Sequence, residues 1–331
     1  MASVFSAKYF HDEEAAFAAV ESIVWPKGPT CPKCGAVDRI NRLAGQHTKP
    51  SKKHPEGKPV IGLWKCYHCR SKFTVRVGTV FEASHVPLTL WLQAAHLMCS
   101  SKKGISSNQL GRILGVQLNT AWFMSHRLRE AMRDGTLPPL GGANKVVEAD
   151  ETYVGGKEKN KHARKRAHAG RGPVTKEAVV SLIERDGRVR SMHLPEVNAK
   201  TLRPILKAQI DKRTYLMTDD ATVYRRIGED FAGHGTVRHS MDEYVRGGGF
   251  QHTNTIENFF SILKRGITGT FHHVSQQHLH RYLAEFDFRH NERAKLGVDD
   301  AQRTARALGG IVGKRLTYRQ SPNEEHSEHG F

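Results

Sequence analysis

The stretch Val146-Val-Glu-Ala-Asp-Glu-Thr-Tyr-Val154, followed by Gly155-Gly156, decides the fold of the larger part of this chain. Its apolar, β-prone run has the length of a strand and is closed by a Gly-Gly turn, which predicts a β-strand. We expect Asp150 to stand at the end of that strand. Because side chains alternate along a strand, Glu151 should then point to the opposite face. The stretch therefore predicts a sheet with a carboxylate at its edge.

Outward from this strand, short apolar runs alternate with segments of helical periodicity. The runs typical of strands are Ala178–Ile183, Val189–Leu194 and Tyr215–Thr218, and the helical segments are Thr201–Ile210, Ala221–Phe231 and Thr255–Arg265. Strands interleaved with helices indicate an α/β sheet domain. We expect it to span residues 143–295, after a linker marked by Pro138-Pro139 and Gly141-Gly142.

Two further acids belong to this domain. Asp219 ends the apolar run Tyr215-Leu-Met-Thr-Asp219, and Glu257 lies on the amphipathic segment Asn254–Gly266 together with Lys264. Seven residues make close to two helical turns, so Glu257 and Lys264 share one face. Carboxylates from two strand ends and a helix can hold two divalent ions about 4 Å apart, and hard oxygen ligands suit Mg²⁺ or Mn²⁺.

Each of these acids, taken singly, could equally be a solvated or helix-capping residue. Other carboxylates compete for the same role: Glu148, Glu151, Asp220, Asp242 and Glu243. An α/β domain could bring Asp150, Asp219 and Glu257 together, which predicts a two-metal site for attack on phosphorus.

A second pattern lies near the N-terminus, where Cys31-Pro-Lys-Cys34 and Cys66-Tyr-His-Cys69 are separated by 31 residues. Two CxxC turns supply the four soft thiolates that tetrahedral Zn²⁺ prefers, and a basic, Pro-rich insertion at 47–59 explains the long gap. Four Cys ligands leave no open coordination position, so the zinc would be structural. The alternatives are ordinary reduced thiols, or His68 in place of one Cys.

The segment between ribbon and sheet reads as a helix-turn-helix. Residues 107–114 and 119–132 have helical periodicity and flank the short turn Leu114-Gly-Val-Gln-Leu118. Such a unit places its second helix in a major groove, although an αα-hairpin that only packs has the same pattern. The candidate groove-facing residues are Gln117, Asn119, Thr120, Ser125, Arg127 and Arg129, with Asn119, Thr120, Arg127 and Arg129 as the expected DNA contacts.

Composition fits a polyanionic partner. The 331 residues include 51 Lys and Arg against 33 Asp and Glu, for a formal net charge of +18. Clustered cationic side chains gain free energy by releasing counterions from phosphates, and the Lys- and Arg-rich run 157–176 could track the DNA backbone or form a solvated loop. No apolar run has the roughly 18 residues of a membrane span, and no signal-peptide pattern opens the sequence. We expect no membrane partner and a cytoplasmic, nucleoid-associated protein.

Together these motifs resemble insertion-sequence transposases of the DDE superfamily with an N-terminal zinc ribbon, the ISXO-like family. The resembling segments are CPKCG, WKCYHCRSKFTVRVGTVFEASHVPL, VVEADETYVGGK, YLMTDDATVY and the run that starts HTNTIENFFSILKRG, between about residues 12 and 295. The resemblance implies a ribonuclease H-like catalytic domain. It also implies that Asp150, Asp219 and Glu257 are the acidic triad, and that Lys264 contacts a phosphate near the cut.

We therefore predict a transposase that binds the terminal inverted repeats of its element, cleaves their 3′ ends and joins them to target DNA, acting as a homo-oligomer because two ends must be joined in concert. The expected order is an N-terminal helix (1–28), a zinc ribbon (29–82), a helix-turn-helix (88–135), the ribonuclease H-like domain (143–295) and a partly disordered extension (296–331). Two alternatives remain open: a transcriptional regulator with an inactive α/β domain, and a metal-dependent DNA nuclease that cuts without joining.

Overall fold

The computed structural model describes residues 4–52, 54–133, 135, 137–156, 162, 164, 176–237 and 250–317. Their contacts divide the chain into two compact units: Met1–Ser100 with Ser107–Met132 and Asp299–Phe331, and Ser101–Ser106 with Arg133–Val298. We call them the helical unit and the sheet unit. Most of the basic run 157–176, and the tail 320–331 for which we predicted disorder, lie outside the described residues.

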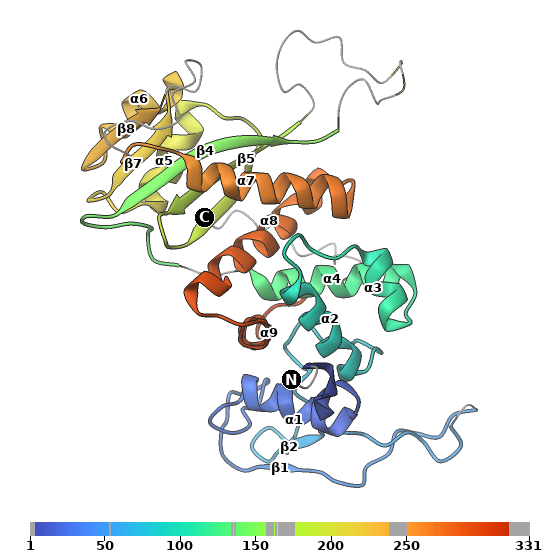
Figure 1. The fold of residues 1–331 in the computed structure, drawn as a ribbon. Helices are drawn as coiled ribbons and strands as arrows, with labels where there is room; N and C mark the ends of the chain where they lie inside the picture. Colours follow the sequence, from blue (N-terminus) through green and yellow to red (C-terminus); the bar gives the residue numbers. More distant parts are fainter. Residues whose placement is uncertain are drawn as a thin grey trace. The chain divides into compact units, whose positions relative to one another are not determined.

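The helical unit contains the zinc ribbon and most of the helices (Figure 1). Its helices are α1 (Glu13–Val24), α2 (Leu88–Ser100), α3 (Ser107–Leu114), α4 (Leu118–Met132) and α9 (Asp300–Gly309), preceded by single 3-10 turns at Val4–Ser6 and Lys8–Phe10. Among its described residues, the short strands β1 (Ile40–Arg42), β2 (Trp64–Cys66) and β3 (Lys72–Phe73) form an antiparallel sheet.

Local sequence explains how this unit is built. Asp12 caps α1, because its carboxylate accepts the backbone N–H of Ala15 at 2.7 Å. The next residue, Glu13, accepts the backbone N–H groups of Leu88 and Thr89 at the start of α2. The C-terminal extension contributes α9, whose Arg303 donates to the carbonyl of Cys99 on α2. Helix α9 therefore packs in this unit although it is far from α2 in sequence.

The turn between α3 and α4 has the predicted Gly. Gly115 adopts φ +65°, a conformation that favours glycine. Within α3, Gly111 lets the chain approach closely, since an added Cβ would lie 3.0 Å from the carbonyl oxygen of Val116 and 3.4 Å from Cβ of Ala121. The two helices therefore pack closely around this turn, an arrangement common to a helix-turn-helix and to an αα-hairpin.

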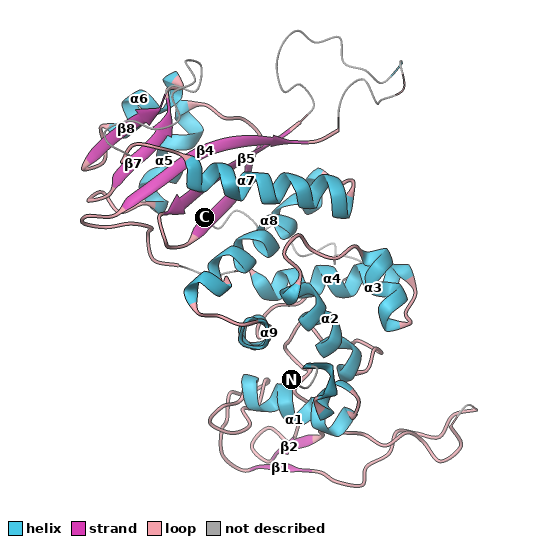
Figure 2. Cartoon of the chain, viewed as in Figure 1, coloured by secondary structure: helices cyan, strands magenta, loops and turns pink. Residues whose placement is uncertain are grey.

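The sheet unit holds an α/β sandwich, coloured by element type in Figure 2. Its strands are β4 (Val146–Val154), β5 (Glu177–Glu184), β6 (Val189–Leu194), β7 (Tyr215–Asp219) and β8 (Gly233–Val237); its helices are α5 (Ala199–Gln209), α6 (Thr222–Gly228), α7 (Asn254–Gly266) and α8 (Gln276–Asn291), with a π-helical turn at Ile267–Phe271 and a 3-10 turn at Ala294–Leu296.

Strand order identifies the fold. Over the described residues, the sheet has the order β6-β5-β4-β7-β8, in which β5 is antiparallel to β4 and β6, whereas β4, β7 and β8 are parallel. In chain order this is 3-2-1-4-5 with an antiparallel second strand, the topology of the ribonuclease H-like fold. The predicted fold class is confirmed.

Each face of the sheet has its own apolar core. On one face, Val147 and Ala149 of β4 pack with α5 and α6, including Leu206 and Tyr224. On the other, Val154 belongs to the cluster formed with α7 and α8. The faces of β4 therefore alternate, and Glu148, Asp150 and Val154 share the α7 side. No helix of the described chain is long and apolar enough to cross a membrane.

Candidate active site and zinc centre

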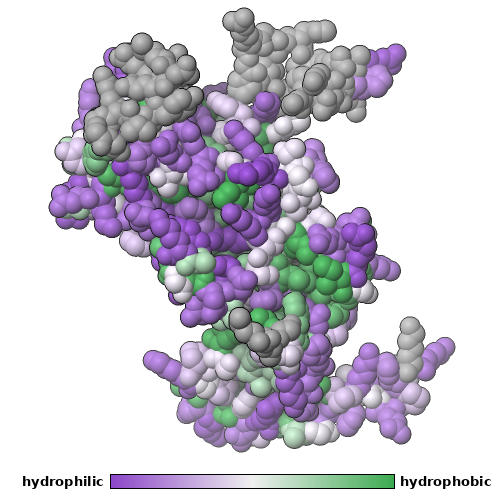
Figure 3. Space-filling model, viewed as in Figure 1, coloured by the Kyte–Doolittle hydropathy of each residue, from purple (hydrophilic) through white to green (hydrophobic). Residues whose placement is uncertain are grey.

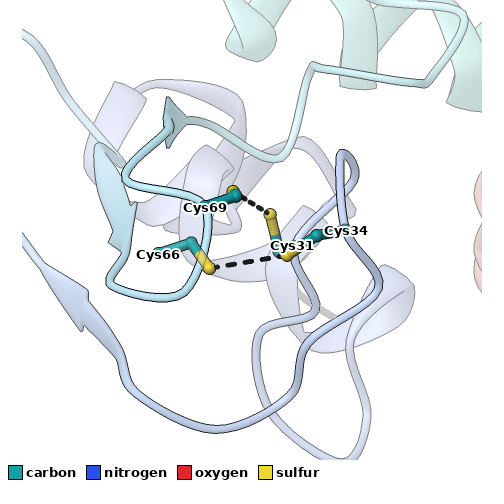
Figure 4. Close-up of side chains that lie close together, drawn as sticks. All are labelled: Cys31, Cys34, Cys66 and Cys69. Atoms are coloured by element: carbon teal, nitrogen blue, oxygen red, sulfur yellow. Dashed lines mark hydrogen bonds between the residues drawn. The ribbon is translucent and has the colours of Figure 1, made fainter.

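Four cysteines of the ribbon converge on one point (Figure 4). Their Sγ atoms all lie within 4.8 Å of one another, with Cys31 to Cys69 at 3.6 Å and Cys34 to Cys66 at 3.7 Å. A tetrahedral zinc with Zn–S bonds of about 2.3 Å would separate its sulfurs by about 3.8 Å. The thiols therefore stand at the spacing that Zn²⁺ requires, and the donor set fits a structural zinc.

Two similar turns create this spacing. Gly35, just after Cys34, and Arg70, just after Cys69, both have positive φ, of 72° and 59°. Each turn is closed by a backbone hydrogen bond, from Gly35 to the carbonyl of Cys31 and from Cys66 to that of Ser71. These local conformations turn both Cys pairs inward.

Apolar side chains and one polar contact complete the ribbon. Trp25 stacks edge-on against Trp64 and Phe73, beside the buried Cys31 and Cys66. His68, the alternative ligand, is instead paired with Asp38 at 2.9 Å and stands outside the sulfur cluster. Among the described residues, the group that could hold a metal ion here is therefore Cys31, Cys34, Cys66 and Cys69, without His68.

Two of the predicted acids, Asp150 and Asp219, lie side by side at the end of β7. Strands β4 and β7 pair in parallel register with Glu148 opposite Met217, and extending that register by two residues sets Asp150 beside Asp219, the last residue of β7. Our prediction that Asp150 ends its own strand is wrong, because β4 continues to Val154 in an antiparallel hairpin with β5. Asp150 lies instead where the neighbouring strand ends.

Electrostatics link these carboxylates. Burial, and then the charge of Glu151, raises the pKa of Asp150 to about 7, with smaller contributions from the charges of Asp219 and Glu257. Asp150 and Asp219 are only half-buried, and so is Glu257. The charges of Asp219 and Glu257 are therefore each close enough to act on Asp150, a repulsion that bound cations would relieve.

Backbone and side-chain contacts orient two of the acids. The Asp219 carboxylate accepts the backbone N–H of Ala221 at 3.1 Å, and the Glu257 carboxylate accepts the hydroxyl of Thr253 at 3.1 Å. Lys264 is exposed two turns further along α7. Among the described residues, these carboxylates do not form a closed group with ligand atoms within 4.8 Å, unlike the cysteines.

Glu151 faces the other side of β4, as predicted. Its carboxylate accepts the hydroxyl of the buried Tyr224 on α6 at 2.7 Å. Burial raises the pKa of Glu151, and the charge of Asp219 adds to that effect. Asp220 does not cap α6 through its side chain; Ala221 occupies the cap position, and the nearby Asp219 accepts its N–H.

The helix-turn-helix corrects part of our prediction. Arg127 and Arg129, expected to face a DNA groove, are only 6% and 0% exposed. Arg127 donates to the carbonyls of Val80 and Glu82, and Arg129 donates to the hydroxyl of Ser125. These arginines serve the interior of the helical unit, because α4 is enclosed beyond its first turn.

The start of α4 remains accessible. Asn119 is exposed and Thr120 is half-buried. Two apolar side chains at the same turn, Ile113 and Leu118, are 52% and 54% exposed. Hydrophobic surface is visible over the region of α3 and α4 in Figure 3.

From the sequence, Glu148 was considered only as a competitor for a place in the acidic triad. The structure shows it as a fully buried carboxylate of β4, bonded to Arg185 and to the first turn of α7. A signal was present in the sequence, since Glu148 is a charged residue inside an apolar strand, in phase with Asp150.

Comparisons with known proteins agree with this architecture. Residues 139–291 match the ISXO2-like transposase domain, and residues 11–72 match the transposase zinc-ribbon domain. The chain thus matches a transposase zinc-ribbon domain followed by an ISXO2-like transposase domain, the order that the resemblance implies.

A relative and two solved structures illustrate the similarity. The chain is 28% identical over 302 residues to an uncharacterized protein in transposable element ISH50 of Halobacterium salinarum, covering 88% of this chain and 95% of that one. A simian T-cell lymphotropic virus intasome in complex with PP2A regulatory subunit B56 gamma is 14% identical over 54% of this chain and 63% of its own, with a TM-score of 0.28. The Mos1 strand transfer complex is 14% identical, covering 66% and 73%, with a TM-score of 0.26.

Proposed function

We propose that this protein binds the terminal inverted repeats of its insertion sequence, cleaves their 3′ ends and transfers them to target DNA. The observation that supports this function best is the meeting of Asp150, Asp219 and Glu257 on one face of the sheet unit, where burial and neighbouring charge raise the pKa of Asp150. A cluster of carboxylate oxygens offers the hard ligands that suit divalent cations.

The three acids would hold two Mg²⁺ or Mn²⁺ ions, which supply activation of an oxygen nucleophile and stabilisation of the leaving oxygen. Asp150 and Asp219 would contribute from β4 and β7, and Glu257 from α7. Lys264, exposed on the same helix, would contact a DNA phosphate near the cut. Water is the nucleophile for end cleavage, and the resulting 3′ hydroxyl is the nucleophile for joining, so neither step requires a covalent link to the protein.

DNA recognition would fall to the helical unit. The first turn of α4 exposes Asn119, and Thr120 follows it, which is where a recognition helix contacts base edges. The zinc ribbon and the net charge of +18 would add contacts to phosphates. Homo-oligomers on DNA follow from the need to bring two ends together.

Purified, zinc-loaded protein incubated with labelled DNA ends tests this function directly. Joined products that require Mg²⁺ and disappear in Asp219→Asn, with end binding retained, are the expected result. Binding without cleavage would favour the regulator, and cleavage without joining would favour the nuclease. Either outcome would overturn the proposed reaction.

A further inference from the structure

Glu148 is a carboxylate with no exposed surface, two residues before Asp150 on β4. Residues two apart on a strand share a face, so Glu148 lies on the α7 side, as Asp150 does. A buried carboxylate is costly unless it is paired and hydrogen-bonded. The Glu148 carboxylate therefore needs hydrogen-bond partners, and it has them.

Its two oxygens bind the start of α7. One oxygen, Oε2, accepts the backbone N–H of Ile256 at 3.0 Å, and the other, Oε1, accepts the hydroxyl of Thr255 at 2.9 Å. The first N–H groups of a helix have no partner within the helix, and a negative charge at this end interacts favourably with the helix dipole. Glu148 thus anchors the first turn of α7 from the neighbouring strand.

Arg185, which directly follows β5, joins a third segment to this contact. Its Nε donates to Glu148 Oε1 at 2.8 Å, while its other nitrogens donate to the carbonyls of Phe250 and His252 at 2.7 and 2.9 Å. The guanidinium therefore holds the chain that leads into α7. His252 Nδ1 also lies 3.3 Å from Glu148 Oε1.

The residue after Ile256 is Glu257. Its own backbone N–H bonds to the carbonyl of Thr253, and its carboxylate accepts the Thr253 hydroxyl. The backbone N–H of Ile256, the residue before Glu257, is thus fixed through Glu148 to the strand that carries Asp150. A one-residue step separates the anchored amide from the proposed metal ligand.

We propose that Glu148, supported by Arg185, is a positioning residue that sets Glu257 against Asp150 so that the two can share divalent cations. This inference rests on the proposed function. Apolar side chains could have packed α7 on the sheet, as Ile256 and Phe260 do, without fixing the phase of its first turn. Hydrogen bonds donated by two successive residues to one carboxylate define both the rotation and the axial position of the helix.

The test measures Mn²⁺ binding to the zinc-loaded full chain by the loss of the free-ion electron paramagnetic resonance signal. Supporting groups of this kind typically change metal affinity by about 10- to 100-fold. We expect Glu148→Ala to weaken Mn²⁺ binding within that range. Glu148→Gln should weaken it less, because its amide oxygen can still accept from Ile256. The matched control, Asp230→Asn, removes a carboxylate that pairs with Arg203 in the same unit and should leave Mn²⁺ binding unchanged.

A double-mutant cycle separates positioning from general stability. In a Glu257→Gln background, Glu148→Gln should weaken residual Mn²⁺ binding no further, since its effect passes through Glu257. Thermal unfolding of each variant identifies folded protein, and Glu148→Gln provides the answer if Glu148→Ala does not fold. A folded Glu148→Gln protein with wild-type Mn²⁺ affinity and wild-type kcat would overturn the inference.

The Asp150→Asn protein distinguishes the two proposals. If Asp150→Asn loses Mn²⁺ binding and joining while Glu148→Gln keeps both, only the positioning inference fails. If Asp150→Asn also keeps both, the proposed metal site itself fails. Equal additional loss from Glu148→Gln in the presence and absence of the Glu257 carboxylate would also contradict positioning, because the effect would then not pass through Glu257.

Discussion

Asp150 and Asp219 stand side by side on parallel strands at the point where β7 ends, and their negative charges repel each other. Burial is the largest cause that raises the pKa of Asp150 to about 7, and the charges of Glu151, Asp219 and Glu257 add to it. The site thus holds repulsion within the fold before any cation binds. Destabilising interactions of this kind are common at binding and catalytic sites.

Removing this charge should stabilise the protein. The folded pKa of Asp150 lies above the unfolded value, so its ionisation destabilises the fold fully above about pH 7 and not at all below about pH 4. Asp150→Asn should therefore gain about 1–3 kcal/mol in free energy of unfolding at pH 8, with zinc bound and no Mg²⁺ added. Urea unfolding measures the gain, which should shrink at pH 5. A loss of stability at pH 8 would contradict it.

Zinc binding should require the four ribbon cysteines and should not require Cys99. Cys66→Ser removes a ligand from the sulfur cluster, so the purified protein should lose zinc and the order of its ribbon. Cys99→Ala is the control, because Cys99 is buried on α2 and stands outside the cluster. Metal analysis by mass spectrometry gives the zinc content. Zinc retained in full by Cys66→Ser would exclude this ligand set.

Arg127 should matter for stability rather than for reading DNA. Arg127→Ala leaves the carbonyls of Val80 and Glu82 without their donor, so we expect a loss of about 2–4 kcal/mol in free energy of unfolding. Arg112→Ala, an exposed residue of α3, should change it by less than about 0.5 kcal/mol. Urea unfolding compares the two proteins, and equal stabilities would refute the structural role.

Asn119 should affect sequence selectivity. Asn119→Ala removes a donor and acceptor exposed at the start of α4, and loss of a base contact costs about 1–3 kcal/mol. Binding to the terminal repeat should therefore weaken by about 5- to 150-fold, while binding to unrelated DNA and the slope of its salt dependence stay unchanged. Gln276→Ala, an exposed amide in the first turn of α8, is the control. Uniform weakening on every sequence would indicate a phosphate contact instead.

Acid should destabilise the sheet unit through His290. Burial, with a smaller contribution from the charge of Arg293, lowers the pKa of His290 to about 4. The unfolded chain binds its proton near pH 6.5, so stability falls as the pH drops from about 6.5 to about 4. His290→Gln should reduce this fall by about 1–2 kcal/mol between pH 7 and pH 5. Identical pH profiles for the two proteins would show that His290 stays charged or exposed.

The sequence predicted the large features because each has a local signature. Alternating strands and helices indicated the α/β sheet, and two CxxC motifs indicated the ribbon, which the family matches and the sulfur geometry support. Asp219 was placed correctly at a strand end because β7 is short and followed at once by a helix. The sequence pattern was sufficient to predict those features that are formed by residues close together in the chain.

Pairing and burial between distant segments were not readable in the same way. Asp150 seemed to end a strand because the Gly-Gly turn follows closely, yet pairing with β5 extends β4 past it. Arg127 and Arg129 lie on a helix whose sequence is typical of one that contacts DNA, but segments from elsewhere in the chain enclose them. Arg127, for example, also donates to the carbonyl of Leu316. The anchoring role of Glu148 depends on a residue 108 positions later in the chain.

The β4–β5 hairpin also makes the position of Asp150 independent of the length of the connection between the two strands. Its register runs from Val147 opposite Glu184 to Val154 opposite Glu177, with Asp150 opposite Ser181 in the middle. Paired residues on both sides therefore hold Asp150 before the chain reaches Gly156. Relatives could lengthen or shorten the basic connection, and an engineer could insert a label or a tether there, without moving the acid, since closing a longer loop costs only slowly increasing entropy.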